Sequence, residues 1–136
     1  MINYKVRSAK FPRMESPVYY PVAVVTSPLT LQDVAEEIEK YCMLTVPDII
    51  SVVTALESSI VSHLSQGHSV RLGYLGSFRP TIAAKQTRSS REEVKASDIK
   101  RVRCRFTPSA AFRKTLSKDR LHFKRVASTP AEEGQE

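Results

Sequence analysis

The hydrophobic pattern of the chain changes its period at Ser69, and this change limits the possible folds more than any other feature. Between Leu31 and Leu64, apolar side chains recur at the three- and four-residue intervals of helices. From Ser69 onward, apolar and polar side chains alternate, as they do in strands with one buried face. The chain therefore belongs to the α+β class.

Two helices are expected before this change of period. Thr30 and Asp33 form a capping pair, and the first helix should end near Met43. The second helix should begin at Thr45 and end at Gly67. Its apolar face is wide enough to pack on more than one neighbour, which indicates a partner subunit.

Two strands with a polar connection follow the helices. Residues 69–78, SVRLGYLGSF, hold two glycines that permit a tight turn with positive φ. The next residues alternate up to Lys85, and Arg101–Phe106 has arginine at every second position with apolar side chains between. Such a strand has one face on a core and one face held out to anions. Residues Gln86–Lys100 have no core of their own, which predicts a protruding arm that orders on a ligand.

Short elements are expected at both ends of the chain. Ile2–Val6 and Val18–Val25 should form a hairpin with a long connection, in which Pro21 favours an edge position or a bulge. A short basic helix should occupy residues 108–117, and a last strand should run from Leu121 to Val126.

Charge is divided unequally along the chain, whose formal net charge is +7. Residues 29–66 carry one basic and six acidic side chains, whereas residues 79–125 carry fifteen basic and four acidic ones. A protein with this polarity attracts polyanions, and nucleic acid is the leading candidate.

The sequence lacks the features of an enzyme, a metalloprotein or a membrane protein. The three histidines, Cys42 and Cys104 show no catalytic or metal-ligand spacing, so we expect no enzymatic activity, no metal and no cofactor, and we expect both cysteines as reduced core thiols. No apolar run approaches the ~20 residues that cross a bilayer, and the start MINYKVRSAK lacks the apolar centre of a secretion signal. We expect a cytoplasmic protein with no membrane partner and no small-molecule substrate.

Two strings, SVRLGYLGSF before the arm and VRCRFTPSAAFRKTL after it, carry a resemblance to a known family. Residues 75–78 match the second half of the family's glycine turn, and Phe106 matches the aromatic residue after the arm. Arg113 and Lys114 stand where the family keeps basic residues. Over about residues 29–118, the chain resembles the HU/IHF family of bacterial histone-like DNA-binding proteins.

This resemblance implies a fold and a function. The fold would be HU/IHF-like, with two N-terminal helices, a three-stranded antiparallel sheet with a protruding β-arm, a short C-terminal helix and added terminal strands, in an intertwined homodimer. The function would be sequence-nonspecific binding and bending of double-stranded DNA by arms in the minor groove, as a nucleoid-associated, architectural protein that condenses DNA. The domains would be an N-terminal hairpin extension (1–28), the DNA-binding domain (29–126) and a flexible acidic tail (127–136).

Candidate site residues come from the arm, the short helix and the apolar interior. The side chains assigned to DNA binding are Arg79, Lys85, Arg88, Arg91, Lys95, Lys100, Arg101, Arg103, Arg105, Arg113 and Lys114. Those assigned to the dimer core are Leu56, Ile60, Leu75, Phe78 and Phe106.

Three features depart from the family pattern. No proline occurs between Pro80 and Pro108, although the family commonly places a wedge proline near each arm tip. Glu92 and Glu93 place negative charge inside the arm. About 28 extra N-terminal residues precede the first helix, and with the last strand they should form a small added sheet. Two alternatives remain open: an HU-fold module for protein interaction, and an RNA-binding chaperone, each with only weak DNA affinity.

Overall fold

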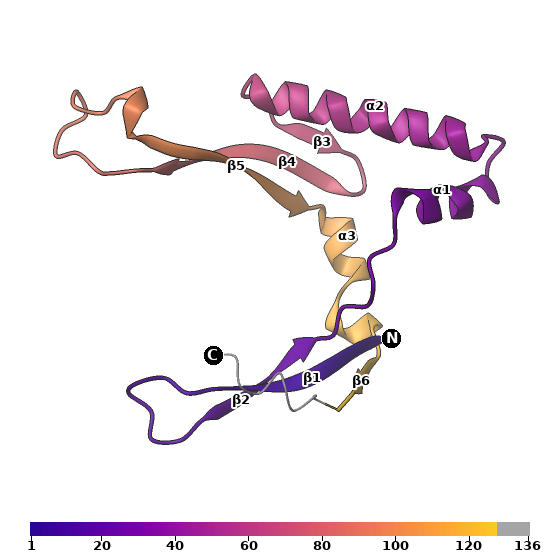
Figure 1. The fold of residues 1–136 in the computed structure, drawn as a ribbon, viewed down its shortest axis with the longest axis horizontal. Helices are drawn as coiled ribbons and strands as arrows, with labels where there is room; N and C mark the ends of the chain where they lie inside the picture. Colours follow the sequence, from indigo (N-terminus) through magenta and orange to yellow (C-terminus); the bar gives the residue numbers. More distant parts are fainter. Residues whose placement is uncertain (128–136) are drawn as a thin grey trace. The chain divides into compact units, whose positions relative to one another are not determined.

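The computed structural model describes residues 1–127, which fall into two units (Figure 1). One unit comprises Thr30–Thr115, and the other joins Met1–Leu29 to residues 116–127. The residues after Thr115 therefore group with the N-terminal hairpin. The expected acidic tail, 127–136, lies outside the described residues except for Ala127.

The larger unit begins with helices α1 (Leu31–Glu39) and α2 (Val46–Ser65). Both start at a capping box, in which a carboxylate accepts the backbone N–H of the capping threonine. The distance is 2.8 Å from Thr30 to Asp33 and 3.2 Å from Thr45 to Asp48. Both predicted helix starts are confirmed. Within residues 1–127, no helix is long and apolar enough to cross a membrane.

Helix α1 is shorter than predicted, because it ends at Glu39 and not near Met43. The N–H of Tyr41 bonds the carbonyl of Ile38, three residues back, which is a tighter turn than an α-helix makes. The side chains of Tyr41 and Met43 are exposed, so within residues 1–127 little packing stabilises a further helical turn.

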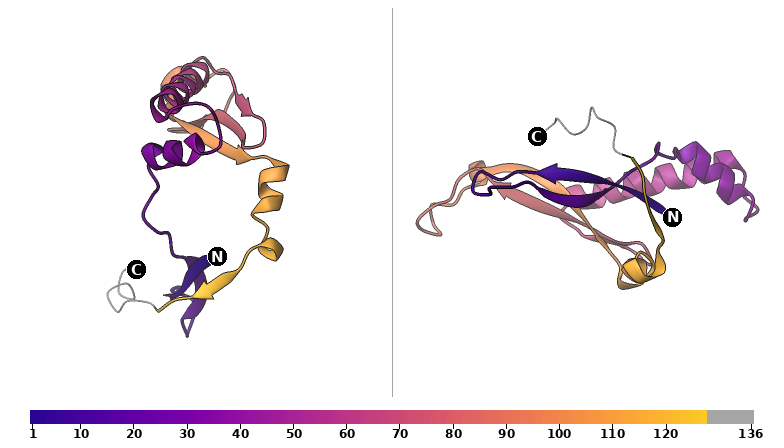
Figure 2. Two further views of the ribbon diagram at one scale, coloured as in Figure 1. Left: turned by 90° about the vertical axis from the view of Figure 1, so that its right-hand side faces the viewer. Right: turned by 90° about the horizontal axis from the view of Figure 1, so that it is seen from below.

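Strands β3 (Val70–Leu72), β4 (Gly76–Ala84) and β5 (Ile99–Pro108) form an antiparallel sheet in that order. Helix α2 lies against β3 and β4 (Figure 2). Strand β3 pairs only with Gly76–Phe78, so the rest of β4 and its partner β5 continue as a two-stranded ribbon. The predicted antiparallel sheet is confirmed, and residues 79–105 are called the arm below.

Helix α3 (Ala110–Thr115) is held to the base of the arm by aromatic rings. The ring of Phe106 lies 5.0 Å from that of Phe78 across the β4–β5 pair. It also lies 6.5 Å from Phe112 of α3, which in turn lies 6.4 Å from Tyr74. Aromatic pairs at these separations attract each other beyond their burial, so this cluster helps to hold α3 at the base of the arm.

The smaller unit is a three-stranded sheet with the order β2-β1-β6. Its central strand β1 (Ile2–Ala9) pairs antiparallel with β2 (Val18–Ala23) and parallel with β6 (Phe123–Arg125). Both ends of the chain thus contribute to one added sheet, as expected. Pro21 lies in β2, which is an edge strand. Proline has no N–H to donate, and an edge strand tolerates this because only one of its sides pairs with a neighbour.

A single copy of the chain buries few apolar side chains. Among the described residues, Ala35 and Ile49 are the buried hydrophobic ones. Cys42 and Cys104 were expected in the core, and this expectation was wrong, because both are free and exposed. Cys104 lies on β5, opposite Pro80 of β4.

The sheet predicts a strict requirement for glycine at position 76. Gly76 has φ 141°, and a Cβ there would overlap the carbonyl oxygen of Thr107 and lie 2.9 Å from Cα of Pro108. Gly76→Ala should therefore destabilise the fold by about 3 kcal/mol, which lowers Tm by roughly 10 °C or more in thermal unfolding. The control is Gly73→Ala, since Gly73 has φ 38° but no atom within 4 Å of the added carbon. Equal Tm shifts for the two variants would contradict the prediction.

Candidate nucleic-acid interface

The arm presents arginine side chains on one face of its ribbon. Residues that pair across two strands share a face, and successive residues of a strand alternate between faces. The pairs on this face are Arg79 with Arg105, Thr81 with Arg103 and Ala83 with Arg101. We call it the arginine face. All four of its arginines are exposed.

No carboxylate balances the arginine face within residues 1–127. Arg79 lies directly opposite Arg105, and like charges at such positions oppose strand pairing. None of the four guanidinium groups is in an ion pair with a described residue. Along β5 the arginines recur about every 6.6 Å, roughly twice the 3.4 Å axial spacing of phosphates on one DNA strand. Charge and spacing therefore suit a phosphate backbone.

Strand β3 adds a further cation that the sequence-based site did not include. Arg71 pairs with Ser77, which is two residues before Arg79 and so lies on the same face. The signal was present in the sequence, because Val70 and Leu72 point to the apolar side and leave Arg71 on the other. The arginine face therefore continues from the arm onto the body.

The opposite face of the ribbon is apolar, and it is exposed toward the outer end of the arm. Its cross-strand pairs are Phe78 with Phe106, Pro80 with Cys104 and Ile82 with Val102. Ile82 and Val102, near the outer end, are 64% and 65% exposed. The arm is thus a ribbon with two chemically different sides, as the alternation in the sequence predicted.

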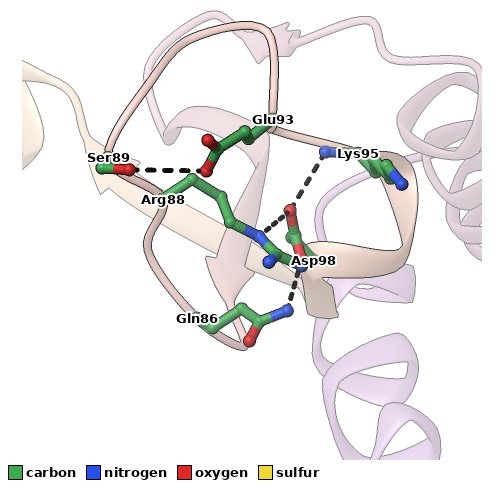
Figure 3. Close-up of polar contacts among 6 residues, drawn as sticks. All are labelled: Gln86, Arg88, Ser89, Glu93, Lys95 and Asp98. Carbon is green, nitrogen blue, oxygen red and sulfur yellow. Dashed lines mark hydrogen bonds and ion pairs between the residues drawn. The ribbon is translucent and has the colours of Figure 1, made fainter.

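A loop of residues 85–98 closes the arm and is folded around one carboxylate (Figure 3). Asp98 accepts hydrogen bonds from Nη2 of Arg88 at 2.9 Å and from its Nε at 3.2 Å. It also accepts from Nε2 of Gln86 at 2.7 Å and from the backbone N–H of Lys95 at 3.0 Å. The carbonyl of Asp98 accepts the N–H of Lys85 at 2.6 Å. Asp98 is only 5% exposed and is the buried charged residue of the described chain.

This carboxylate corrects the expectation that residues 86–100 have no core. Their core is polar, and it is supplied by Asp98, which sequence reasoning missed. The available signal was its position three residues after Lys95, the spacing of a capping pair; it ends the short 3₁₀ turn η1 (Ala96–Asp98). Arg88, assigned to DNA from the sequence, uses both Nε and Nη2 on Asp98, so within the chain it positions the loop.

The remaining candidate cations occupy three different places. Lys85, Arg91 and Lys95 are exposed in the loop. Lys100 lies in β5 at the irregularity where Ala83 pairs with Arg101 and Ala84 pairs with Ile99, so Lys100 has no residue directly opposite it on β4. Arg113 and Lys114 are exposed in the last turn of α3, away from the loop in sequence and topology. The structure thus groups the strand arginines into one face and leaves the other cations outside it.

Hydrogen bonding to the Asp98 carboxylate lowers its pKa from 3.8 to about 2. The largest cause is the Arg88 side chain, followed by the Lys95 N–H and the Gln86 amide. Each of these donors favours the charged form of the acid. Asp98 is therefore ionised throughout the physiological range, and the loop keeps its polar core.

Comparison with known families matches residues 1–125 to the family HU-HIG, described as "HU domain fused to wHTH, Ig, or Glycine-rich motif". No curated protein matches the chain significantly. A similar solved structure is that of a "Putative bacterial DNA binding protein from Bacteroides vulgatus ATCC 8482", with a TM-score of 0.62 and 13% sequence identity. The match covers 94% of this chain and 50% of that one, so this chain spans half the length of that protein. At this identity the likeness shows a shared fold.

The loop predicts a specific effect of removing the Asp98 charge. Asp98→Asn should loosen residues 85–98, because the amide cannot accept all the hydrogen bonds that the carboxylate accepts. Limited trypsin digestion should then cleave within the loop several-fold faster. The matched control is Glu93→Gln, which removes the same charge from the same loop but disturbs only a 3.5 Å contact with Ser89. Equal cleavage rates would refute this role of Asp98.

The lowered pKa of Asp98 predicts an acid-sensitive loop. A carboxylate whose pKa is lower in the folded state stabilises that state above its ordinary pKa. This contribution is lost as the pH falls from about 4 to about 2, the window set by the ordinary and folded values of 3.8 and about 2. NMR titration of the Asp98 carboxyl carbon should give a midpoint near 2. A midpoint near 3.8 would show that the four hydrogen bonds do not persist in solution.

Proposed function

Because the chain belongs to the HU-HIG family of HU domains, we propose that it is a non-enzymatic, architectural DNA-binding protein of the bacterial nucleoid. In this proposal the chain works as a homodimer, and each arm lies along the minor groove of double-stranded DNA. Binding is nonspecific in sequence and depends on the DNA backbone and its deformability.

The arginine face is the observation that carries this proposal. Its four arm arginines are exposed and have no acidic partner among the described residues, and the three on β5 recur at every second position. A polyanion relieves the repulsion between Arg79 and Arg105, so binding and strand pairing support each other. Groups that read base edges are scarce, because Gln86, the amide of the arm, is bonded to Asp98.

The apolar surface of the single chain supports the homodimer. Of the side chains assigned to the dimer core, Leu56, Leu75 and Phe106 are exposed, and Ile60 and Phe78 are half-buried. Fully burying one such side chain contributes about 1.5–3 kcal/mol. A second copy of the chain would bury these side chains, as the wide apolar face of α2 predicts.

The loop of the arm favours a gentle bend. Its residues 85–98 contain no proline, and Asp98 organises them with hydrogen bonds. Glu92 and Glu93 add negative charge near the tip. In this proposal the arm holds the DNA backbone through its arginine face, while its polar loop inserts no apolar wedge between base pairs.

The test removes two arginines from the middle of the face. Arg103→Ala with Arg105→Ala should lower the slope of log K against log salt by about 0.9 per lost contact, or about 1.8 per chain. Tm should stay within a few degrees of the wild type, because exposed charges contribute at most about 1 kcal/mol. Binding to a random-sequence DNA duplex is measured at several salt concentrations, with an RNA duplex in parallel.

The control Lys118→Ala with Arg120→Ala removes the same charge from the 3₁₀ turn η2 (Lys118–Arg120), outside the arm. Its slope should stay near the wild-type value. Equal slopes for the arm variant and the wild type would show that the arm does not bind DNA and would favour a protein-interaction module. Tighter binding of the RNA duplex would favour the RNA chaperone.

A further inference from the structure

The smaller unit contains a second two-stranded hairpin, β1–β2 (Figure 1). Its strand register places cations on one face of the sheet, as in the arm. Lys5 pairs with Val22 and Arg7 with Tyr20, so the two cations share a face. Strand β6 contributes Lys124 to the same face, because Lys124 pairs with Asn3. We call it the hairpin face. Along β1 its cations lie about 6.6 Å apart, the spacing found along β5.

Among residues 1–127, none of the positions that pair on the hairpin face is a carboxylate. Residues 1–29 and 116–127 contain eight basic side chains and two acidic ones. The acidic residues, Glu15 and Asp119, lie in the hairpin connection and in η2, outside all three strands. Arg7 and Lys124 are exposed and form no ion pair with a described residue. Solvated sheet surfaces normally mix charges of both signs, so this face suits an anionic partner.

The connection of the hairpin, residues 10–17, exposes apolar side chains at its tip. The N–H of Met14 bonds the carbonyl of Phe11 at 2.9 Å, which closes a β-turn with Pro12 at its second position. Proline restricts the backbone of this turn, so the tip is preorganised. Phe11 is 56% exposed and Met14 is 43% exposed. Lys10 precedes Phe11, Arg13 lies between Phe11 and Met14, and Glu15 follows Met14.

Exposed apolar side chains at the end of a cationic ribbon match one form of nucleic-acid binding. Phe, Met and Pro are among the side chains that insert between base steps, partly unstack them and kink the duplex. Flanking cations hold the neighbouring phosphates while the wedge enters. The loop of the arm exposes Val94 but holds no side chain of these three types, and its backbone is organised by Asp98. The β3–β4 turn exposes Leu75, which we assign to the dimer interface, so the β1–β2 tip is the candidate for this action.

We propose that the β1–β2 hairpin is a second DNA-contacting ribbon of this chain. Its hairpin face binds the phosphate backbone, and Phe11 and Met14 insert between base pairs of the duplex. The proposal rests on the proposed function for its ligand, double-stranded DNA, but assigns the kink to the hairpin and not to the arm. In this proposal the arm contributes binding to the DNA backbone, and the hairpin causes most of the bend in the duplex.

The first experiment isolates the tip. A 30-bp duplex carries a donor and an acceptor dye at its two ends, and energy transfer at saturating full-length protein reports the bend. Phe11→Ser with Met14→Ser should reduce the protein-induced change in transfer by half or more and leave the log K against log salt slope unchanged. The control Val25→Ser with Leu29→Ser removes two exposed apolar side chains outside the tip and should bend DNA like the wild type. Wild-type bending by the tip variant would overturn the proposal.

The second experiment isolates the hairpin face. Arg7→Ala with Lys124→Ala should lower the salt slope by about 1.8 per chain, as expected for two lost phosphate contacts. The charge-matched control Lys118→Ala with Arg120→Ala should not, and Arg7→Lys with Lys124→Arg should restore the wild-type slope. Thermal unfolding of each variant verifies that the sheet is intact. A slope equal to that of the control would overturn the proposal and assign the exposed tip to a protein partner.

The arm variant Arg103→Ala with Arg105→Ala separates this inference from the function on which it rests. A lower salt slope in the arm variant, with wild-type slope and bend in the hairpin variants, overturns the second ribbon alone. A wild-type protein that does not bind duplex DNA overturns both proposals. Losses in both sets of variants support two separate contacts on one chain.

Discussion

The structure depends on apolar surface that one copy of the chain leaves uncovered. Within residues 1–127, Ala35 and Ile49 are the buried hydrophobic side chains, and the aromatic cluster at the base of the arm is partly exposed at Phe106. Burial of apolar surface is the main favourable contribution to folding. In the proposed homodimer, a second copy would cover this surface and so stabilise the body that carries the arm.

Charge is arranged on the arm so that its two ends behave differently. Along the strands, Arg79 and Arg105 face each other without an acidic partner, which leaves a repulsion that an anion can relieve. In the loop, the Asp98 carboxylate forms an ion pair with Arg88 and accepts a hydrogen bond from the backbone N–H of Lys95, which orders the loop. The free protein thus keeps its loop folded by an internal ion pair while its strands remain open to a polyanion.

Two hairpins on one chain share an alternation of cationic and apolar residues but end differently. The arm ends in a polar loop with a buried carboxylate, and the β1–β2 hairpin ends in a proline turn that exposes Phe11 and Met14. Two β-strands joined by a short connection can present cations at a regular spacing with little supporting structure. In our proposals, the chemistry of each tip decides whether a ribbon contacts only the DNA backbone or also inserts between bases.

The sequence by itself determined the features that depend on near neighbours. Thr30 and Thr45 cap helices because each stands three residues before an aspartate, and the alternation from Arg101 to Phe106 sets both faces of the arm whatever the strand pairs with. Tertiary structure alone decided that α1 stops at Glu39, that Arg88 bonds Asp98 and that β6 runs parallel to β1. These outcomes depend on contacts between residues that are separated in the sequence. A local sequence pattern does not specify which of those residues come close together in the fold.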